Sequence, residues 1–183
     1  MILETSRLLL RPFDVSDLDV LSSLMANGDF MRFSLGVFSR EQTAAFLERV
    51  RARDRAGLPS QFALILRSNQ KLIGYCGFFL QTVDGVEELE IAYRVDPSHW
   101  GQGLATEAAN VVRDHAFADL QLSHVISLIH PDNIASRRVA EKNGMTPEKE
   151  TIFRGFPTIV FGINHEQREA GTRGSCSPLT KAK

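Results

Sequence analysis

The segment Trp100–Ala109, which reads WGQGLATEAA, constrains the fold more than any other part of the chain. It follows an alternating apolar run, Leu89–Val95, that is closed by Asp96-Pro97, and it leads into a pattern with helical spacing. Gly101 and Gly103 permit a tight turn and a close approach of a ligand, because glycine has no Cβ. The first turn of a helix adds unpaired N–H groups and positive potential. Strand, glycine turn and helix together predict a cradle for a phosphate or pyrophosphate.

Two other phosphate-binding patterns do not fit this segment. A P-loop needs Gly-Lys-Ser/Thr after four spacer residues, and the chain has no such run. The dinucleotide fingerprint needs a third small residue where this chain has Thr106. An ordinary glycine turn that caps a helix remains the alternative interpretation.

The segment resembles the pyrophosphate-binding motif of the GNAT superfamily of N-acetyltransferases, Q/R-x-x-G-x-G/A. Gly103 and Ala105 match its last two small positions, and Trp100 stands where Gln or Arg is usual. The form W-G-x-G-x-A-T-E-A is typical of the RimJ/RimL-type branch, the ribosomal-protein N-terminal acetyltransferases, and the opening Thr5–Pro12 (T-x-R-L-x-L-R-P) also resembles that branch. The resemblance implies that acetyl-CoA is bound by Gly101, Gln102, Gly103, Leu104, Ala105 and Thr106.

A second segment resembles the next conserved part of the superfamily, N-x-x-A/S followed by E-K-x-G-F. It comprises Asn133–Ser136 and Glu141–Met145. The resemblance implies that Asn133 contacts the pantetheine arm of coenzyme A and that Ser136 lies near its thiol. Taken alone, Asn133 is equally a good N-cap and Ser136 an ordinary first-turn residue. Many GNAT enzymes carry a tyrosine that protonates the leaving thiolate where this chain has Ala140, which leaves Ser136 as the candidate acid.

Glu90 is the candidate general base. An alkyl amine has a pKa near about 10, so it is mostly protonated at neutral pH, and a carboxylate acting directly or through water can take the proton. Glu90 aligns with the glutamate of the family's E-I-G-Y pattern. Alternatively, Glu88, Glu90 and Arg94 form a solvated, salt-bridged strand face, because alternate strand residues share a face.

The strand that carries Glu90 has a second expected role. The backbone groups of Tyr93 and Val95 are expected to pair with the pantetheine arm as if it were an added strand. One of these N–H groups would polarise the thioester carbonyl. Residues 29–38, rich in phenylalanine, either pack in the core or form a wall of the acceptor pocket. The histidines are too scattered to predict a metal site.

Periodicity and turn signals predict an α/β (α+β) fold with a mixed central sheet flanked by helices. Asp14 with Asp17 and Ser39 with Gln42 have capping-box spacing and predict two helix starts. Strands are expected at 6–11, 62–66, 72–80, 86–95, 125–130 and, as a closing hairpin, 152–153 and 158–163. Two further helices are expected after Gly103 and between 133 and 143. The domain is expected to span 1–164, followed by a flexible tail at 165–183.

The composition narrows the class of protein. A length of 183 residues suits one buried core, and a net charge of −1 gives no footprint for wrapping nucleic acid. No apolar run is as long as a membrane span, and Met1–Glu4 does not begin a signal peptide. Cys76 and Cys176 have neither metal-type spacing nor a disulfide framework. We therefore expect a cytoplasmic protein, a monomer or homodimer, with no nucleic-acid or membrane partner.

These features predict an acetyl-CoA-dependent N-acetyltransferase that acts on a primary amine. The RimJ/RimL resemblance favours a protein N-terminus as the acceptor. The same branch implies polyamines, amino acids or antibiotics as alternatives. A non-catalytic acyl-CoA-binding module is the alternative from a different class.

Overall fold

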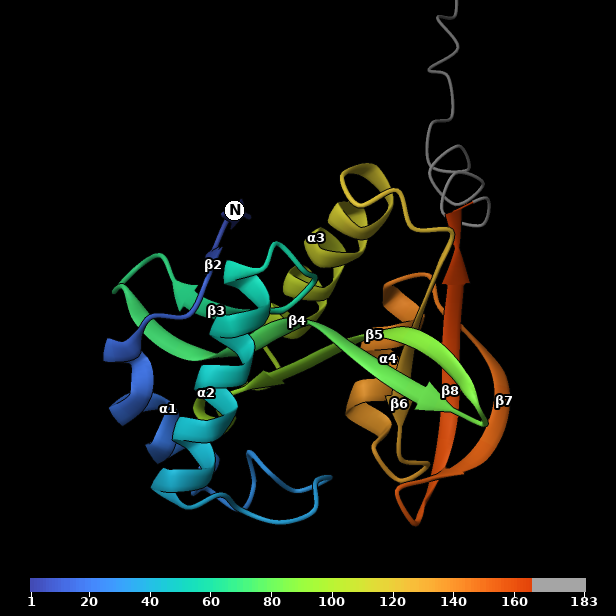
Figure 1. The fold of residues 1–183 in the computed structure, drawn as a ribbon, viewed down its shortest axis with the longest axis horizontal. Helices are drawn as coiled ribbons and strands as arrows, with labels where there is room; N and C mark the ends of the chain where they lie inside the picture. Colours follow the sequence, from blue (N-terminus) through green and yellow to red (C-terminus); the bar gives the residue numbers. More distant parts are fainter. Residues whose placement is uncertain (166–183) are drawn as a thin grey trace, which may run out of the picture.

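A computed structural model describes residues 1–165, so the tail expected at 165–183 lies, apart from His165, outside the described residues. The described chain forms one eight-stranded sheet with the order β1-β2-β3-β4-β5-β6-β8-β7 (Figure 1). Its strands are β1 Leu3–Glu4, β2 Leu8–Arg11, β3 Gln61–Leu66, β4 Lys71–Val83, β5 Val86–Val95, β6 His124–Ile129, β7 Thr146–Phe153 and β8 Phe156–Asn164. Only β5 and β6 pair in parallel, and this confirms the expected mixed α/β sheet.

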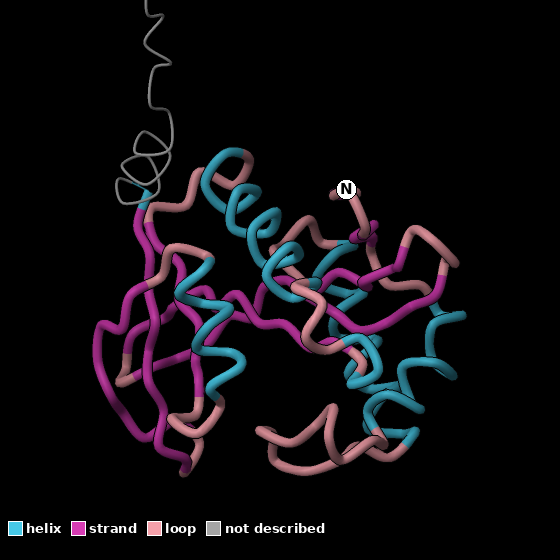
Figure 2. Tube along the Cα trace, turned by 180° about the vertical axis from the view of Figure 1, so that it is seen from behind, coloured by secondary structure: helices cyan, strands magenta, loops and turns pink. Residues whose placement is uncertain are grey.

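Helices cover both faces of this sheet. They are the short 3-10 turns η1 Val15–Asp17 and η2 Pro97–His99 and the α-helices α1 Leu18–Met25, α2 Arg40–Arg55, α3 Leu104–Ala118 and α4 Ile134–Lys142. The apolar side chains of α1 and α2 pack on Ala63 and Tyr75, whereas those of α3 pack on Phe62 and Cys76. Neighbouring residues of a strand point to opposite faces, so α1 and α2 lie on one side and α3 on the other. Figure 2 shows α3 and α4 from their own side of the sheet.

The helix starts follow their predicted caps. The side chains of Asp14 and Ser39 each accept a hydrogen bond from a backbone N–H of the first turn. The side chains of Asp17 and Gln42 in turn accept from the backbone N–H groups of Asp14 and Ser39, so both capping boxes are formed. The first box opens η1, and α1 continues from it at Leu18. Within residues 1–165 no helix has the length and apolar character that a membrane span needs.

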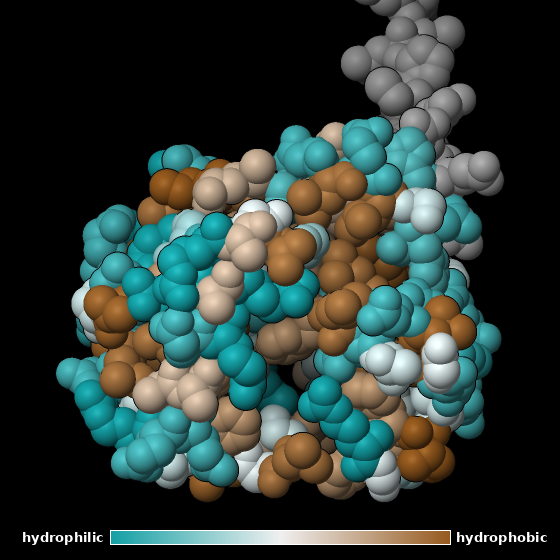
Figure 3. Space-filling view, in the orientation of Figure 1, coloured by the Kyte–Doolittle hydropathy of each residue, from teal (hydrophilic) through white to brown (hydrophobic). Residues whose placement is uncertain are grey.

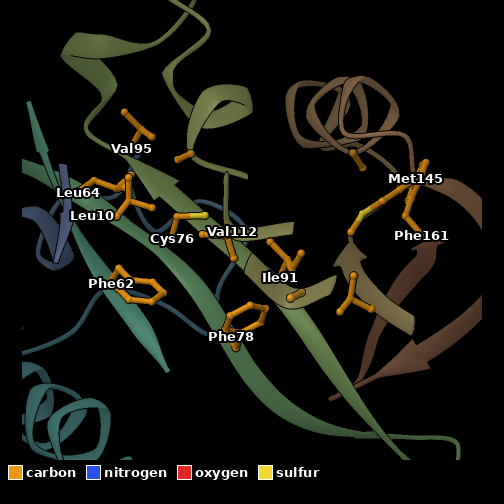
Figure 4. Packing of buried hydrophobic residues seen from close by; sticks show 14 of the residues in the cluster. Leu10, Phe62, Leu64, Cys76, Phe78, Ile91, Val95, Val112, Met145 and Phe161 are labelled. Atoms are coloured by element: carbon orange, nitrogen blue, oxygen red, sulfur yellow. The ribbon is translucent and has the colours of Figure 1, made fainter. Parts of the chain in front are cut away.

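The largest core cluster lies between α3 and the sheet. It includes Leu10, Phe62, Cys76, Phe78, Ile91 and Phe161 from the strands and Val112 from α3, all of which Figure 4 labels. Cys76 is fully buried, and burial raises the pKa of its thiol far above the ordinary value. This core fixes the strands from which the site residues project.

The sheet parts between β5 and β6. These strands pair at a single register, Glu90 opposite Ile126. The Ser127 hydroxyl donates to the Ile91 carbonyl at 2.7 Å and joins the two strands just beyond that point. Figure 1 shows β4 and β5 running obliquely while β6 and β8 stand upright beside them. The second half of β5 therefore has an edge that β6 does not cover.

Candidate active site

The predicted glycine cradle lies between η2 and α3. Gly101 and Gly103 have φ values of 75° and 77°, in the left-handed region that glycine adopts without strain. Gly103 is the N-cap of α3, and the helix begins at Leu104, so its first N–H groups point at the turn. Trp100 donates from Nε1 to the Val95 carbonyl at 2.7 Å and ties the turn to the end of β5. The turn, Gly101–Gly103, is exposed and open to an anion.

A cluster around Glu107 supports this cradle. Arg7 donates from Nη1 to the Gln102 carbonyl at 2.8 Å and from Nε to the Glu107 carboxylate at 2.6 Å. Glu107 also accepts the Thr5 hydroxyl, the Ser6 hydroxyl at 3.2 Å and the Arg7 backbone N–H at 2.9 Å. Although burial alone would raise it, hydrogen bonds from Thr5 and Arg7 lower the pKa of Glu107. The sequence pattern contained Arg7 in the T-x-R opening but gave no sign that it reaches α3.

The backbone of β5 alternates between its two sides. Asp96 N–H donates to Ile73 C=O at 2.7 Å on the β4 side. Ile91 C=O accepts from Ser127 on the β6 side, so the odd positions of this stretch face β6. Tyr93 and Val95 are odd positions, and they lie beyond the single β5–β6 register. Their backbone groups therefore point into the gap, although Trp100 occupies the Val95 carbonyl.

Helix α4 lies across this gap from β5. Asn133 is its N-cap, with Oδ1 accepting from Ser136 N–H at 3.1 Å, which is the structural role that the sequence left open for Asn133. The Tyr93 hydroxyl donates to the Ser136 carbonyl at 2.9 Å and so holds β5 and α4 together. Burial raises the pKa of Tyr93 well above its ordinary value. Ala140 is buried in the core and has no proton to give.

Glu90 lies at the point where β5 and β6 part. Its neighbours in the sheet are Phe79 on β4 and Ile126 on β6. The side chain is only 9% exposed, and it accepts from Gln81 Nε2 at 2.6 Å. Glu90 is therefore buried and bound to a neutral amide, and it is not part of a solvated, salt-bridged strand face.

The surroundings of Glu90 act on its charge in opposite directions. Burial raises the pKa of the carboxyl above its ordinary value. Hydrogen bonds from Gln81 and from the Leu128 backbone oppose this rise, as do the positive charges of Arg154 and Arg94. A buried carboxyl with a raised pKa next to a gap in the sheet has the properties of a general base.

Arg94, on the same face as Glu90, holds the loop of residues 29–38. It donates to the Phe30 carbonyl at 2.6 Å and to the Ser34 hydroxyl. Phe30 is buried, as the core interpretation predicted, whereas Phe33 is 39% exposed and stacks on His130 at the end of β6, with ring centroids 5.6 Å apart. Figure 3 shows a hollow in this face between the half that carries α2 and the half built on β6–β8. The loop thus bridges the two halves of the sheet.

The structure brings most of the predicted residues to one region. Glu90 lies on the sheet face that carries α1 and α2, while Tyr93 and Ser136 lie across the gap between β5 and α4. The glycine turn lies at the C-terminal end of the same strand. The sequence motifs contained Arg7 and Glu107 without giving them a role, and they did not indicate Gln81 or Arg154. No cluster of His, Cys, Asp and Glu placed to hold a metal occurs within residues 1–165.

Comparison with known proteins identifies the family to which the chain belongs. The model of the acetyltransferase (GNAT) domain matches residues 7–146. The uncharacterized N-acetyltransferase YnaD of Bacillus subtilis is 32% identical over 149 residues, which cover 81% of this chain and 84% of YnaD. The uncharacterized protein YkkB of the same organism is 32% identical over 160 residues, 87% and 93% of the two chains.

Solved structures share the fold. The GNAT-family acetyltransferase from Bacillus anthracis matches with a TM-score of 0.77 and 26% identity over 91% of this chain and 99% of that one. RimL, the ribosomal L7/L12 alpha-N-protein acetyltransferase in complex with coenzyme A, matches with a TM-score of 0.76 and 20% identity over 90% and 98%. The likeness to RimL is one of fold, so the RimJ/RimL type is not established. The chain belongs to the GNAT family of acetyltransferases and is an acyltransferase enzyme.

Proposed function

We propose that the protein transfers the acetyl group of acetyl-CoA to a primary amine. The observation that carries this proposal is the place of Glu90, a buried carboxyl beside the uncovered edge of β5. The same strand thus offers a proton acceptor on one face and open backbone groups at its edge. Amide synthesis from a thioester needs these two functions together.

The described residues fit acetyl-CoA as a substrate. The glycine turn and the first turn of α3 (residues 101–106) would hold its pyrophosphate, because left-handed glycines and free helix N–H groups form an anion site. The N–H groups of Tyr93 and Val95 would pair with the pantetheine arm in the gap. Asn133, at the start of α4, would contact the same arm.

The reaction then needs the removal of one proton from the amine and the stabilisation of the sulfur that leaves as a thiolate. The amine nitrogen attacks the thioester carbon, and Glu90 accepts the amine proton, directly or through water. A backbone N–H at the β5 edge stabilises the negative oxygen of the addition product. The carbon–sulfur bond breaks, and the Ser136 hydroxyl donates a hydrogen bond to the departing sulfur. A thiol with a pKa near about 8.5 leaves without a stronger acid, which is consistent with Ala140 at the usual tyrosine position.

The acceptor is a protein N-terminus or a small-molecule amine. The opening Thr5–Pro12 and the RimL-like fold support an N-terminal amine. An L-2,4-diaminobutyric acid acetyltransferase of Streptomyces anulatus supports the second class, because it is 39% identical over 69 residues, 34% of this chain. Both classes present a primary amine to the same base.

A thiol-release assay across an acceptor panel tests the proposal. The panel contains N-terminal peptides, diamino acids, polyamines and aminoglycosides, and we expect acetyl-CoA cleavage that depends on one of these classes. Glu90→Gln should lower kcat by about a hundredfold or more at neutral pH with little change in acetyl-CoA affinity, and a higher pH should restore part of the rate. Tight acetyl-CoA binding without release for any amine would instead identify a non-catalytic acyl-CoA-binding module.

A further inference from the structure

We propose that Gln81 and Arg154 are positioning residues that hold Glu90 as a proton-accepting carboxylate. The inference rests on the proposed function of Glu90 as the base. The three side chains come from β4, from the turn between β7 and β8, and from β5. They form one continuous chain of hydrogen bonds. The sequence motifs gave no sign that any two of these residues are in contact.

The contacts run in one direction. Gln81 donates from Nε2 to Glu90 Oε2 at 2.6 Å. Arg154 donates from Nη2 to Gln81 Oε1 at 3.1 Å. Gln81 and Glu90 are 8% and 9% exposed, so water competes little for these bonds.

Arginine fixes which way the amide of Gln81 points. A guanidinium has donors and no acceptor, so the atom of Gln81 that faces Arg154 is the oxygen. The amide NH₂ is thereby turned toward Glu90 and can only donate to it. A donor of this kind binds the ionised carboxylate more strongly than the protonated acid, whose only remaining acceptor is less negative. The chain of hydrogen bonds therefore opposes the effect of burial and favours the form of Glu90 that can accept the proton of an amine.

The turn between β7 and β8 brings Arg154 back over the sheet. Arg154 has a φ of 52° and Gly155 a φ of 85°, the backbone of a tight hairpin turn that joins Phe153 to Phe156. The guanidinium lies over the Phe153 ring at 5.0 Å from its centroid. This contact and the Gln81 oxygen hold the arginine on the sheet, although the residue is exposed at the turn.

The other ionisable groups around Glu90 do not replace this chain. Arg94, on β5, also favours the carboxylate of Glu90 through its charge, but its hydrogen bonds go to the loop of residues 29–38. The phenols of Tyr75 on β4 and Tyr93 on β5 are the other titratable groups that interact electrostatically with Glu90. Burial raises the pKa of both phenols, so they stay neutral in the working pH range. Arg154 is thus the charge that orients the donor.

The pH dependence of kcat/KM tests the proposal. Gln81→Met removes the donor at similar size, and Arg154→Met keeps contact with Phe153 but frees the amide to turn. Both variants should move the acidic limb of kcat/KM to higher pH, with a loss of about ten- to a hundredfold at neutral pH that a higher pH largely restores. An NMR titration of isotope-labelled Glu90 should show the same displacement without turnover. Arg49→Met, an exposed arginine on α2, is the matched control and should leave the profile unchanged.

Glu90→Gln measured alongside separates this inference from the proposed function. If Glu90→Gln loses activity while Gln81→Met and Arg154→Met keep the parent's acidic limb, the positioning role is overturned and the base assignment stands. A loss of rate at every pH, with an unshifted limb and a lower Tm, means a merely structural role and also overturns the inference. Parent-like activity of Glu90→Gln would overturn the base assignment and this inference with it.

Discussion

At the scale of single residues, Gly103 is the position where the backbone of the cradle is most restricted. Its φ of 77° strains any branched side chain, although the nearest atom that a Cβ would meet is Arg7 Nη2 at 3.7 Å. We expect Gly103→Val to weaken acetyl-CoA binding at least about tenfold, or ~1.4 kcal/mol, because the N–H groups at the start of α3 lose their alignment. Gly85→Val, with a φ of 84° in the distant β4–β5 turn, is the matched control for backbone strain. Calorimetric affinities that are equal in the two variants would contradict the cradle.

The buried Glu90 also predicts how stability depends on pH. Its pKa is raised in the folded state by burial, so the folded protein binds this proton more tightly than the unfolded chain. The resulting stabilisation is fully present below the ordinary value of 4.5 and is lost as the pH rises through the folded pKa. We expect the Tm of the parent to fall relative to that of Glu90→Gln across this window, as measured by thermal unfolding of both proteins. A constant difference would show that Glu90 titrates alike in both states.

The sequence motifs pointed to Glu90 as the candidate base but not to the residues that form hydrogen bonds with it. The E-I-x-Y pattern is local and is visible in any strand of this kind. Gln81 becomes a neighbour of Glu90 only through the β4–β5 register, and Arg154, 73 residues beyond Gln81, only through the fold of the whole sheet. Hydrogen bonds of such long range have no periodicity in the sequence.

At the scale of elements, the start of β2 and the first turn of α3 act as one unit. Arg7 holds the Gln102 carbonyl and compensates the charge of Glu107 beside the expected phosphate path. We expect Arg7→Met to weaken acetyl-CoA binding about three- to tenfold, because a charged hydrogen bond to the cradle is lost and a carboxylate is left unpaired. Adding Glu107→Gln should recover part of this loss in a double-mutant cycle of affinities.

The matched control for Arg7 is Arg40→Met, which breaks an exposed ion pair with Asp19 far from the cradle. Equal affinities in Arg7→Met and Arg40→Met would remove Arg7 from the binding of acetyl-CoA.

Helices were easier to predict than the edges of the sheet. The caps at Asp14 and Ser39 are local hydrogen-bonding patterns, and both formed as expected. The strand expected at 6–11 begins only at Leu8, and the two-residue β1 was missed. Strand β7 begins at Thr146, earlier than the 152–153 expected. Its first part was missed because residues 146–150 are all exposed and show no alternation of apolar and polar side chains. An exposed edge strand is defined by its partner, here β8, and not by its own pattern.

At the scale of the whole molecule, the gap between β5 and β6 was beyond the reach of local patterns. The sequence indicated a helix after Gly103, and this helix, α3, connects the two parallel strands. The single register at Glu90 and Ile126, however, joins strands that are far apart in the sequence, and neither strand's own pattern shows where their pairing stops. The expected pairing of Tyr93 and Val95 with a substrate needs this gap.

The position of β8 between β6 and β7 has a consequence for synthesis of the chain on the ribosome. Translation produces β6 and then β7, but each of them pairs with β8, which comes last. Until residues up to Asn164 have left the exit tunnel, β6 lacks its antiparallel partner, and the half of the sheet built on β6–β8 cannot be completed. The first five strands have no such dependence, because each pairs with the one made just before it. We therefore expect nascent chains to pass through a half-folded stage with an exposed strand edge, and the part of the sheet beside the gap between β5 and β6 to form late in the protein's synthesis.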